Sequence, residues 1–192
     1  MPSISHVWFI PARRPFWKSD VRVLISLLMP LLAALALCQD SFIPPLSSPI
    51  AGMRPADVRD TFTETHNGHM HEAADIMEPA GTPVHAVADG AIRKLFLSKP
   101  GGITIYQYDV TGAFCYYYAH LQSYAPGLTE GMHVHAGEVI GFVGSTGNAV
   151  ATAPHLHFAV TKLDATREYW KGTALNPYSA LLDAARRGAL SR

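Results

Sequence analysis

Short alternating runs of apolar and polar residues, divided by glycine turns, fill the chain from about residue 60 onward. Alternation with a period of two is typical of strands that bury one face. The pattern predicts strands over 83–88, 91–97, 103–108 and 113–121, a hairpin formed by 131–137 and 138–143, and a last strand over 155–161. Only residues 178–187 have a helical pattern. We therefore expect a mostly β fold, a single antiparallel β-sheet domain with glycine-rich hairpins and a short C-terminal helix.

The first 38 residues have the pattern of an export segment. An apolar run over 23–37 follows four basic residues, and it is shorter than the about 20 residues that a membrane-spanning helix needs. Residues 12–18 resemble a twin-arginine export motif, and residues 35–38 resemble a lipoprotein box that ends at Cys38. Three interpretations stay open: a cleaved signal, a lipidated leader, or an uncleaved anchor that tethers the chain to the membrane. Each of them places the rest of the chain in the periplasm or cell envelope.

The remaining segments set the domain boundaries. Residues 39–59 are rich in Pro and Ser, and we expect a linker without structure of its own. This gives a leader over 1–38, a linker over 39–59 and one domain over 60–192. The chain has 192 residues, 48% of them apolar and 16% charged, which is enough to fill a core. Lys+Arg and Asp+Glu are 15 each, so nothing in the charge indicates a nucleic-acid partner. Cys115 is expected to be a small buried strand residue.

Candidate chemistry lies in the histidines. His155 and His157 are two positions apart in a predicted strand, so they share one face while Leu156 and Phe158 point into the core. Such a pair is a metal pair, one ligand beside one catalytic group, or an exposed polar face. His71 and Asp75 lie in a segment that predicts a loop leading into a short strand. Two imidazole nitrogens and one carboxylate oxygen suit Zn²⁺ and leave a position open for water.

His120 is the third element, at the end of a predicted aromatic strand. By parity it shares a face with Tyr116 and Tyr118. That aromatic face either lines a groove for a peptide strand or packs within the sheet. Taken alone, a histidine in this position is more often a core or rim residue than a catalyst.

In order and spacing, these residues resemble the lysostaphin-like (LytM, M23) metallopeptidase family over residues 61–162. The motifs that carry the resemblance are His71–Asp75, Gly81–Gly90, Tyr118–Leu121, the glycine-punctuated stretch 131–147, and Pro154–Phe158. The resemblance implies that His71, Asp75 and His157 are zinc ligands and that His120 and His155 are an unliganded active-site pair. Ala73 stands where the family usually has Gly.

The resemblance also implies a function. We expect a zinc-dependent endopeptidase that hydrolyses peptide bonds of bacterial peptidoglycan with a metal-activated water. The alternative is a non-catalytic module of the same family that activates cell-wall amidases, with a regulatory protein partner; loss of ligands marks such modules. A biotinyl or lipoyl carrier domain needs a lysine at a hairpin tip, and residues 131–144 contain none. A structural zinc site is usually closed by four ligands and rich in Cys.

Five other histidines are expected to have no metal role. His133 and His135 repeat the two-residue spacing, but they lie in a glycine-bounded segment and are predicted to be exposed. The others, near the first ligand motif, are interpreted as structural: His66, His69 and His85.

Overall fold

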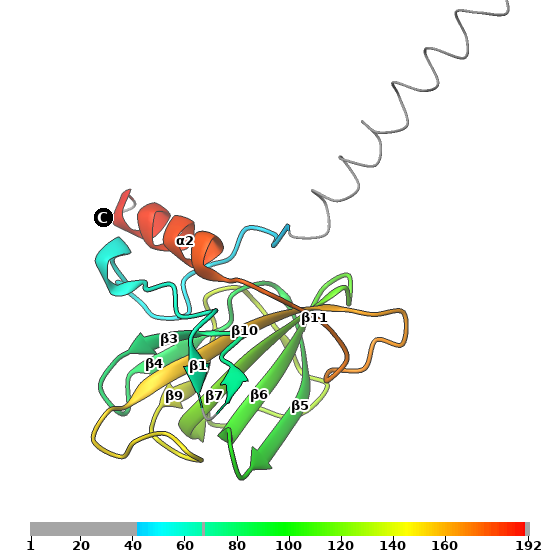
Figure 1. Cartoon of the computed structure of the whole chain (residues 1–192). Helices are drawn as coiled ribbons and strands as arrows, with labels where there is room; N and C mark the ends of the chain where they lie inside the picture. The colour runs from blue at the N-terminus through cyan, green and yellow to red at the C-terminus, as the bar shows by residue number, and fades with distance from the viewer. Residues whose placement is uncertain (1–41, 67, 191–192) are drawn as a thin grey trace, which may run out of the picture. The chain divides into compact units, whose positions relative to one another are not determined.

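Antiparallel strands dominate the computed structural model, which describes residues 42–66 and 68–190 (Figure 1). The strands are β1 (Thr65–His66), β2 (His69–Met70), β3 (Ala74–Met77), β4 (Pro83–His85), β5 (Gly90–Ser98), β6 (Gly102–Asp109), β7 (Phe114–Tyr124), β8 (His133–Val134), β9 (Val139–Val143), β10 (His155–Leu163) and β11 (Gly172–Leu175). A short 3-10 helix, η1 (Pro55–Asp57), precedes them and an α-helix, α2 (Tyr178–Leu190), follows them. The mostly β fold with one short C-terminal helix is thus confirmed.

One large sheet organises the domain. Its strands follow the order β11-β10-β7-β6-β5-β8, while β3 pairs with β10, and β9 pairs with both β7 and β4. All of these pairings are antiparallel. β1 and β2 form a separate two-stranded hairpin. Strand β10 lies at the centre of the site described below, because β3 and β7 flank it on opposite sides at His157 and Phe158.

The core lies against one face of this sheet. Ile105, Tyr116, Tyr118, Leu156 and Phe158 are all fully buried in it. Because side chains alternate along a strand, the residues between them face the other way. The prediction for β10 is therefore confirmed: Leu156 and Phe158 enter the core, and the two histidines beside them lie on the opposite face.

Two predictions about pairing were wrong. Residues 131–137 and 138–143 do not form a hairpin, because β8 pairs with β5 whereas β9 pairs with β4 and β7. At the junction of the two segments, the backbone of Ala86 bonds to both Gly137 and Glu138. The strand at 155–161 is also not the last one. β11 follows it and pairs with the second half of β10, where Val160 lies opposite Leu175.

From Ile43 onward, the segment predicted as a linker is part of the domain. The compact unit runs Ile43–Arg192, and Leu46, Ile50 and Met53 are at most 3% exposed within its core. Backbone hydrogen bonds tie the segment to β4 and the residues after it, including His85 N–H to the carbonyl of Pro49 at 2.9 Å. Regularly spaced apolar residues thus outweigh the Pro and Ser composition. The predicted leader over 1–38 lies outside the described residues.

Helix α2 covers the same segment (Figure 1). Leu181, Ala184 and Ala185 form its buried side, and the Arg187 guanidinium donates a hydrogen bond to the carbonyl of Leu46 at 2.7 Å. In the part of the chain that the structure describes, no helix is long and apolar enough to cross a membrane. Cys115 is buried as predicted, and burial raises the pKa of its thiol to about 12.

Candidate metal centre and active site

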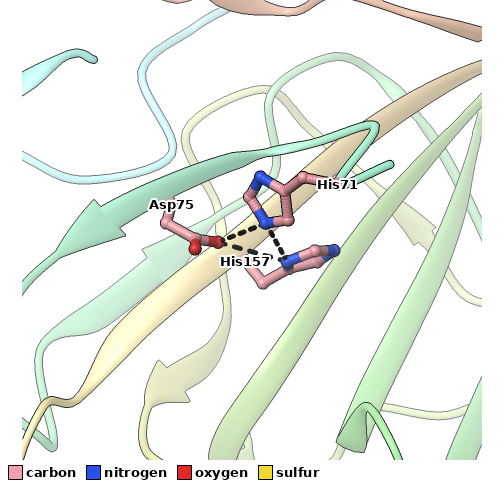
Figure 2. A group of neighbouring side chains, drawn as sticks. All are labelled: His71, Asp75 and His157. Atoms are coloured by element: carbon pink, nitrogen blue, oxygen red, sulfur yellow. Dashed lines mark hydrogen bonds and ion pairs between the residues drawn. The ribbon is translucent and has the colours of Figure 1, made fainter. Parts of the chain in front are cut away.

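Three side chains bring one ligand atom each to a single point (Figure 2). The Nε2 atom of His71 lies 3.1 Å from the Oδ1 atom of Asp75, and the Nδ1 atom of His157 lies 3.1 Å from that same oxygen. The two nitrogens are also 3.1 Å apart. Within the described residues, these three form the group that could hold a metal ion.

Sheet register and one turn position the three residues. Asp75 on β3 lies directly opposite His157 on β10, so the two side chains share a face. His71 comes from the loop before β3, and Glu72 after it has a φ of 54°, a left-handed conformation that non-glycine residues seldom adopt. Ala73 is not among the residues with positive φ. Its methyl, in place of the family's usual Gly, is therefore compatible with the backbone.

The tautomer of His71 favours a cation between the three atoms. Its Nδ1–H donates to the carbonyl of Thr61 at 3.0 Å, so the neutral ring has only a lone pair at Nε2. That lone pair faces a carboxylate oxygen at 3.1 Å, so either a proton on Nε2 or a metal cation must lie between the two atoms. Tetrahedral zinc with bonds of about 2.0–2.2 Å separates its ligand atoms by about 3.3–3.6 Å. The observed spacing is close to that value, so the donor set fits Zn²⁺.

The electrostatics of the cluster point the same way. Burial alone would raise the pKa of Asp75, but hydrogen bonds with His157 and His71 outweigh it and lower the pKa below the usual range. The hydrogen bond with Asp75 in turn raises the pKa of His71. The carboxylate therefore stays charged near neutral pH and provides a negative centre for a cation.

His120 and His155 lie beside the cluster without joining it. Their ring centroids are 4.9 Å apart, and His120 is 5.5 Å from the ring of His157. His120 Nδ1 bonds to the carbonyl of Thr146 at 2.8 Å, and His155 Nδ1 bonds to that of Ala153 at 2.9 Å. Nε2 of each ring is therefore not engaged by these carbonyls, and Nε2 of His155 lies 3.9 Å from Oδ1 of Asp75. Burial lowers the pKa of His120, against the opposing effect of its bond to Thr146.

The backbone at His120 breaks the predicted alternation. His120 has a φ of 59°, and the pairing of β6 with β7 shifts register between Ile103 and Ile105. As a result His120 lines the cavity of the site, whereas Tyr116 and Tyr118 are buried in the core. The groove suggested for these two tyrosines was wrong, and packing within the sheet is what the structure shows.

The five polar residues surround one cavity of about 530 Å³. Tyr117 and Ala119 of β7 line this cavity, and the loop over 148–150 forms another part of its wall. This volume lies in the range of pockets that bind small ligands. The structure thus brings together all the site residues predicted from the sequence: His71, Asp75, His120, His155 and His157.

Among the other histidines, His133 and His135 are exposed as predicted. His85 lies 3.4 Å from the carbonyl of Pro49 through Nδ1, in a structural contact. His69 lines the cavity, although it was interpreted as structural. His66 belongs to β1.

Sequence reasoning missed Thr61. This residue is 7% exposed, and its hydroxyl accepts from the N–H of Asp75 and donates to the carbonyl of Ala73, both at 3.3 Å. With its own carbonyl it also orients His71. Thr61 therefore contacts two of the three candidate ligands, a role that depends on the backbone and has no signature in the sequence.

Comparisons with known proteins identify the family of this chain. The model of peptidase family M23 matches residues 69–177, more than half of the chain, and the chain therefore belongs to this family. The L-Ala--D-Glu endopeptidase of Bacillus subtilis is 34% identical over 117 residues, which are 58% of this chain and 34% of that protein. The DD-carboxypeptidase/endopeptidase Mpg of Neisseria meningitidis is 42% identical over 95 residues, 48% of this chain and 20% of that protein.

A solved structure also resembles this chain. The catalytic domain of the antimicrobial peptidase lysostaphin from Staphylococcus simulans matches with a TM-score of 0.51 and 36% identity, over 60% of this chain and 81% of that one. The chain spans at most about a third of the length of the two curated relatives above.

Proposed function

We propose that this chain is a zinc-dependent endopeptidase that hydrolyses peptide bonds of bacterial peptidoglycan. The observation that carries the proposal is the convergence of three ligand atoms, from His71, Asp75 and His157, at mutual distances of 3.1 Å. Two further imidazoles lie beside them in the same cavity. The names of the two relatives above support a peptide substrate, and a third relative, the peptidoglycan DD-endopeptidase ShyC of Vibrio cholerae, supports peptidoglycan as its source. A substrate there also requires export, in line with the leader predicted over 1–38.

When bound, Zn²⁺ acts as a Lewis acid and lowers the pKa of water to about 7. His71, Asp75 and His157 would hold the ion through Nε2, Oδ1 and Nδ1. His120 and His155 handle the protons at Nε2, because their Nδ1 atoms are engaged with backbone carbonyls. Between them they accept a proton from the attacking water and deliver one to the leaving amine. The peptide C–N bond breaks, and water supplies the second oxygen of the new carboxylate and the proton that the leaving amine receives.

The test starts from the purified full chain. Bound zinc is measured per chain, and release of peptides from purified cell-wall sacculi is followed with and without a chelator. One zinc per chain and cleavage that the chelator stops and added zinc restores would support the enzyme. Zinc without cleavage, but with stimulation of a cell-wall amidase, would instead identify the non-catalytic activator. A chain without zinc would contradict the ligand assignment.

A further inference from the structure

A row of four aromatic rings leads away from the candidate metal centre. Tyr117 lines the cavity, and its ring centroid is 6.0 Å from that of His157. Tyr106 lies 4.7 Å from Tyr117 and 4.6 Å from Tyr169, and Tyr169 lies 4.5 Å from Trp170. We call these four residues, Tyr117, Tyr106, Tyr169 and Trp170, the aromatic row. It is continuous with the cavity because Tyr117 belongs to both.

The aromatic row is not part of the domain core. Tyr106 lies between the buried residues Ile105 and Gln107 on β6, and so it points to the opposite face of the sheet. Tyr117 does the same on β7, between two buried tyrosines. The row ends at Trp170, which is 60% exposed. Trp170 is therefore the member of the row that is most open to a ligand.

The loop that carries the end of the row is fastened to the sheet. It joins β10 to β11 and is drawn in orange in Figure 1. The Tyr108 hydroxyl donates to the carbonyl of Arg167, and the Arg167 guanidinium donates to the carbonyl of Gly112. Asp164 accepts from both the N–H and the hydroxyl of Thr166. Trp170 is therefore presented by a loop that is already ordered, which lowers the entropic cost of binding.

We propose that the aromatic row binds the glycan strand of peptidoglycan next to the peptide that enters the cavity. Aromatic faces carry partial negative charge, and the C–H groups on the flat face of an amino sugar carry partial positive charge, so the two stack. The exposed indole of Trp170 is uncharged, and its face suits a sugar ring better than the charged ends of a peptide stem. This inference rests on the proposed function, since a cell-wall substrate carries sugars beside its peptides.

Three variants of the full chain test the inference: Trp170→Ala, Trp170→Phe, and Leu190→Ala as a control at another exposed apolar residue, 88% exposed. Binding to peptide-free glycan strands is measured by calorimetry. Cleavage is measured both on sacculi and on cross-linked peptides freed from the glycan. We expect Trp170→Ala to weaken glycan binding and to lower kcat/KM on sacculi, each about fivefold or more. Cleavage of the free peptides should not change, and the other two variants should resemble the wild type.

The outcomes separate this inference from the proposed function. Wild-type protein that cleaves free peptides but does not bind glycan would overturn the aromatic row as a sugar site and leave the peptidase intact. An equal loss on sacculi and free peptides in Trp170→Ala would also overturn it, because Trp170 would then act on the peptide. Glycan binding that depends on Trp170, in a chain that cleaves neither substrate, would support the row and contradict the enzyme.

Discussion

Asp75 and His157 lie directly opposite each other on neighbouring antiparallel strands, with Oδ1 of one 3.1 Å from Nδ1 of the other. The candidate ligand set therefore depends on the register of β3 against β10. A slip by one residue would turn the Asp75 carboxylate to the other face of the sheet. His71 completes the set from the preceding loop, where the positive φ at Glu72 turns the chain into β3.

Replacing His157 should abolish metal binding. In His157→Ala the cluster keeps one imidazole and one carboxylate. Loss of a residue that only contacts a metal ligand lowers metal affinity about 10–100-fold, and we expect zinc affinity to fall by more than that here. The measurement is zinc per chain after dialysis, followed by competition with a chelator. His133→Ala is the matched control, since His133 is an exposed histidine in the other two-residue pair. Unchanged zinc in His157→Ala would show that the ligands lie elsewhere.

Replacing His120 should separate chemistry from metal binding. Its Nδ1 is bonded to Thr146 and its ring is not in the ligand cluster, so zinc should remain bound. Turnover should fall about 10²–10⁴-fold, the usual contribution of acid–base catalysis. His120→Asn is preferred to His120→Ala because Asn tolerates the φ of 59°. Zinc content and peptide release are measured together, with His135→Ala as the control. Full activity in both His120 variants would leave this residue without a chemical role.

Thr61 should tune the metal centre without touching the metal. Thr61→Val keeps the shape but leaves the N–H of Asp75 and the carbonyl of Ala73 without their partner. We expect zinc affinity to fall about 10–100-fold and the free energy of unfolding to fall by about 1–3 kcal/mol. Chelator competition and urea unfolding measure the two effects. Thr61→Ser retains the hydroxyl and should restore both; wild-type zinc affinity in Thr61→Val would argue against the role.

The sequence predicted the strand-borne part of the site well. Period-two alternation placed His155 and His157 on one face because Leu156 and Phe158 between them are plainly apolar. It failed at His120, where a positive φ and a register shift override alternation. No residue type in this stretch indicates a register shift. The same failure assigned the groove to Tyr116 and Tyr118, although Tyr117 is the tyrosine that lines the cavity.

The N-terminal boundary was harder to predict for a different reason. Proline lacks a backbone donor, so a Pro-rich segment cannot form a regular ladder and has the composition of a linker. Yet its carbonyls still accept hydrogen bonds, as Pro49 does from His85. Its few apolar residues were enough to bury it. Burial of an irregular segment depends on the space that the rest of the fold leaves for it. The sequence of the segment itself does not indicate whether that space exists.

Ile50 tests whether this segment stabilises the domain. It is 1% exposed and packs in the main core, so Ile50→Ala should lower the free energy of unfolding by about 2–5 kcal/mol. Phe42→Ala is the control, because Phe42 is 62% exposed and its loss should change stability by no more than about 0.5 kcal/mol. Urea unfolding of the full chain, followed by far-UV circular dichroism, compares the two variants with wild type. Equal stability of Ile50→Ala and wild type would mean that residues 43–58 contribute nothing to the fold in solution, and the predicted boundary at residue 60 would then stand.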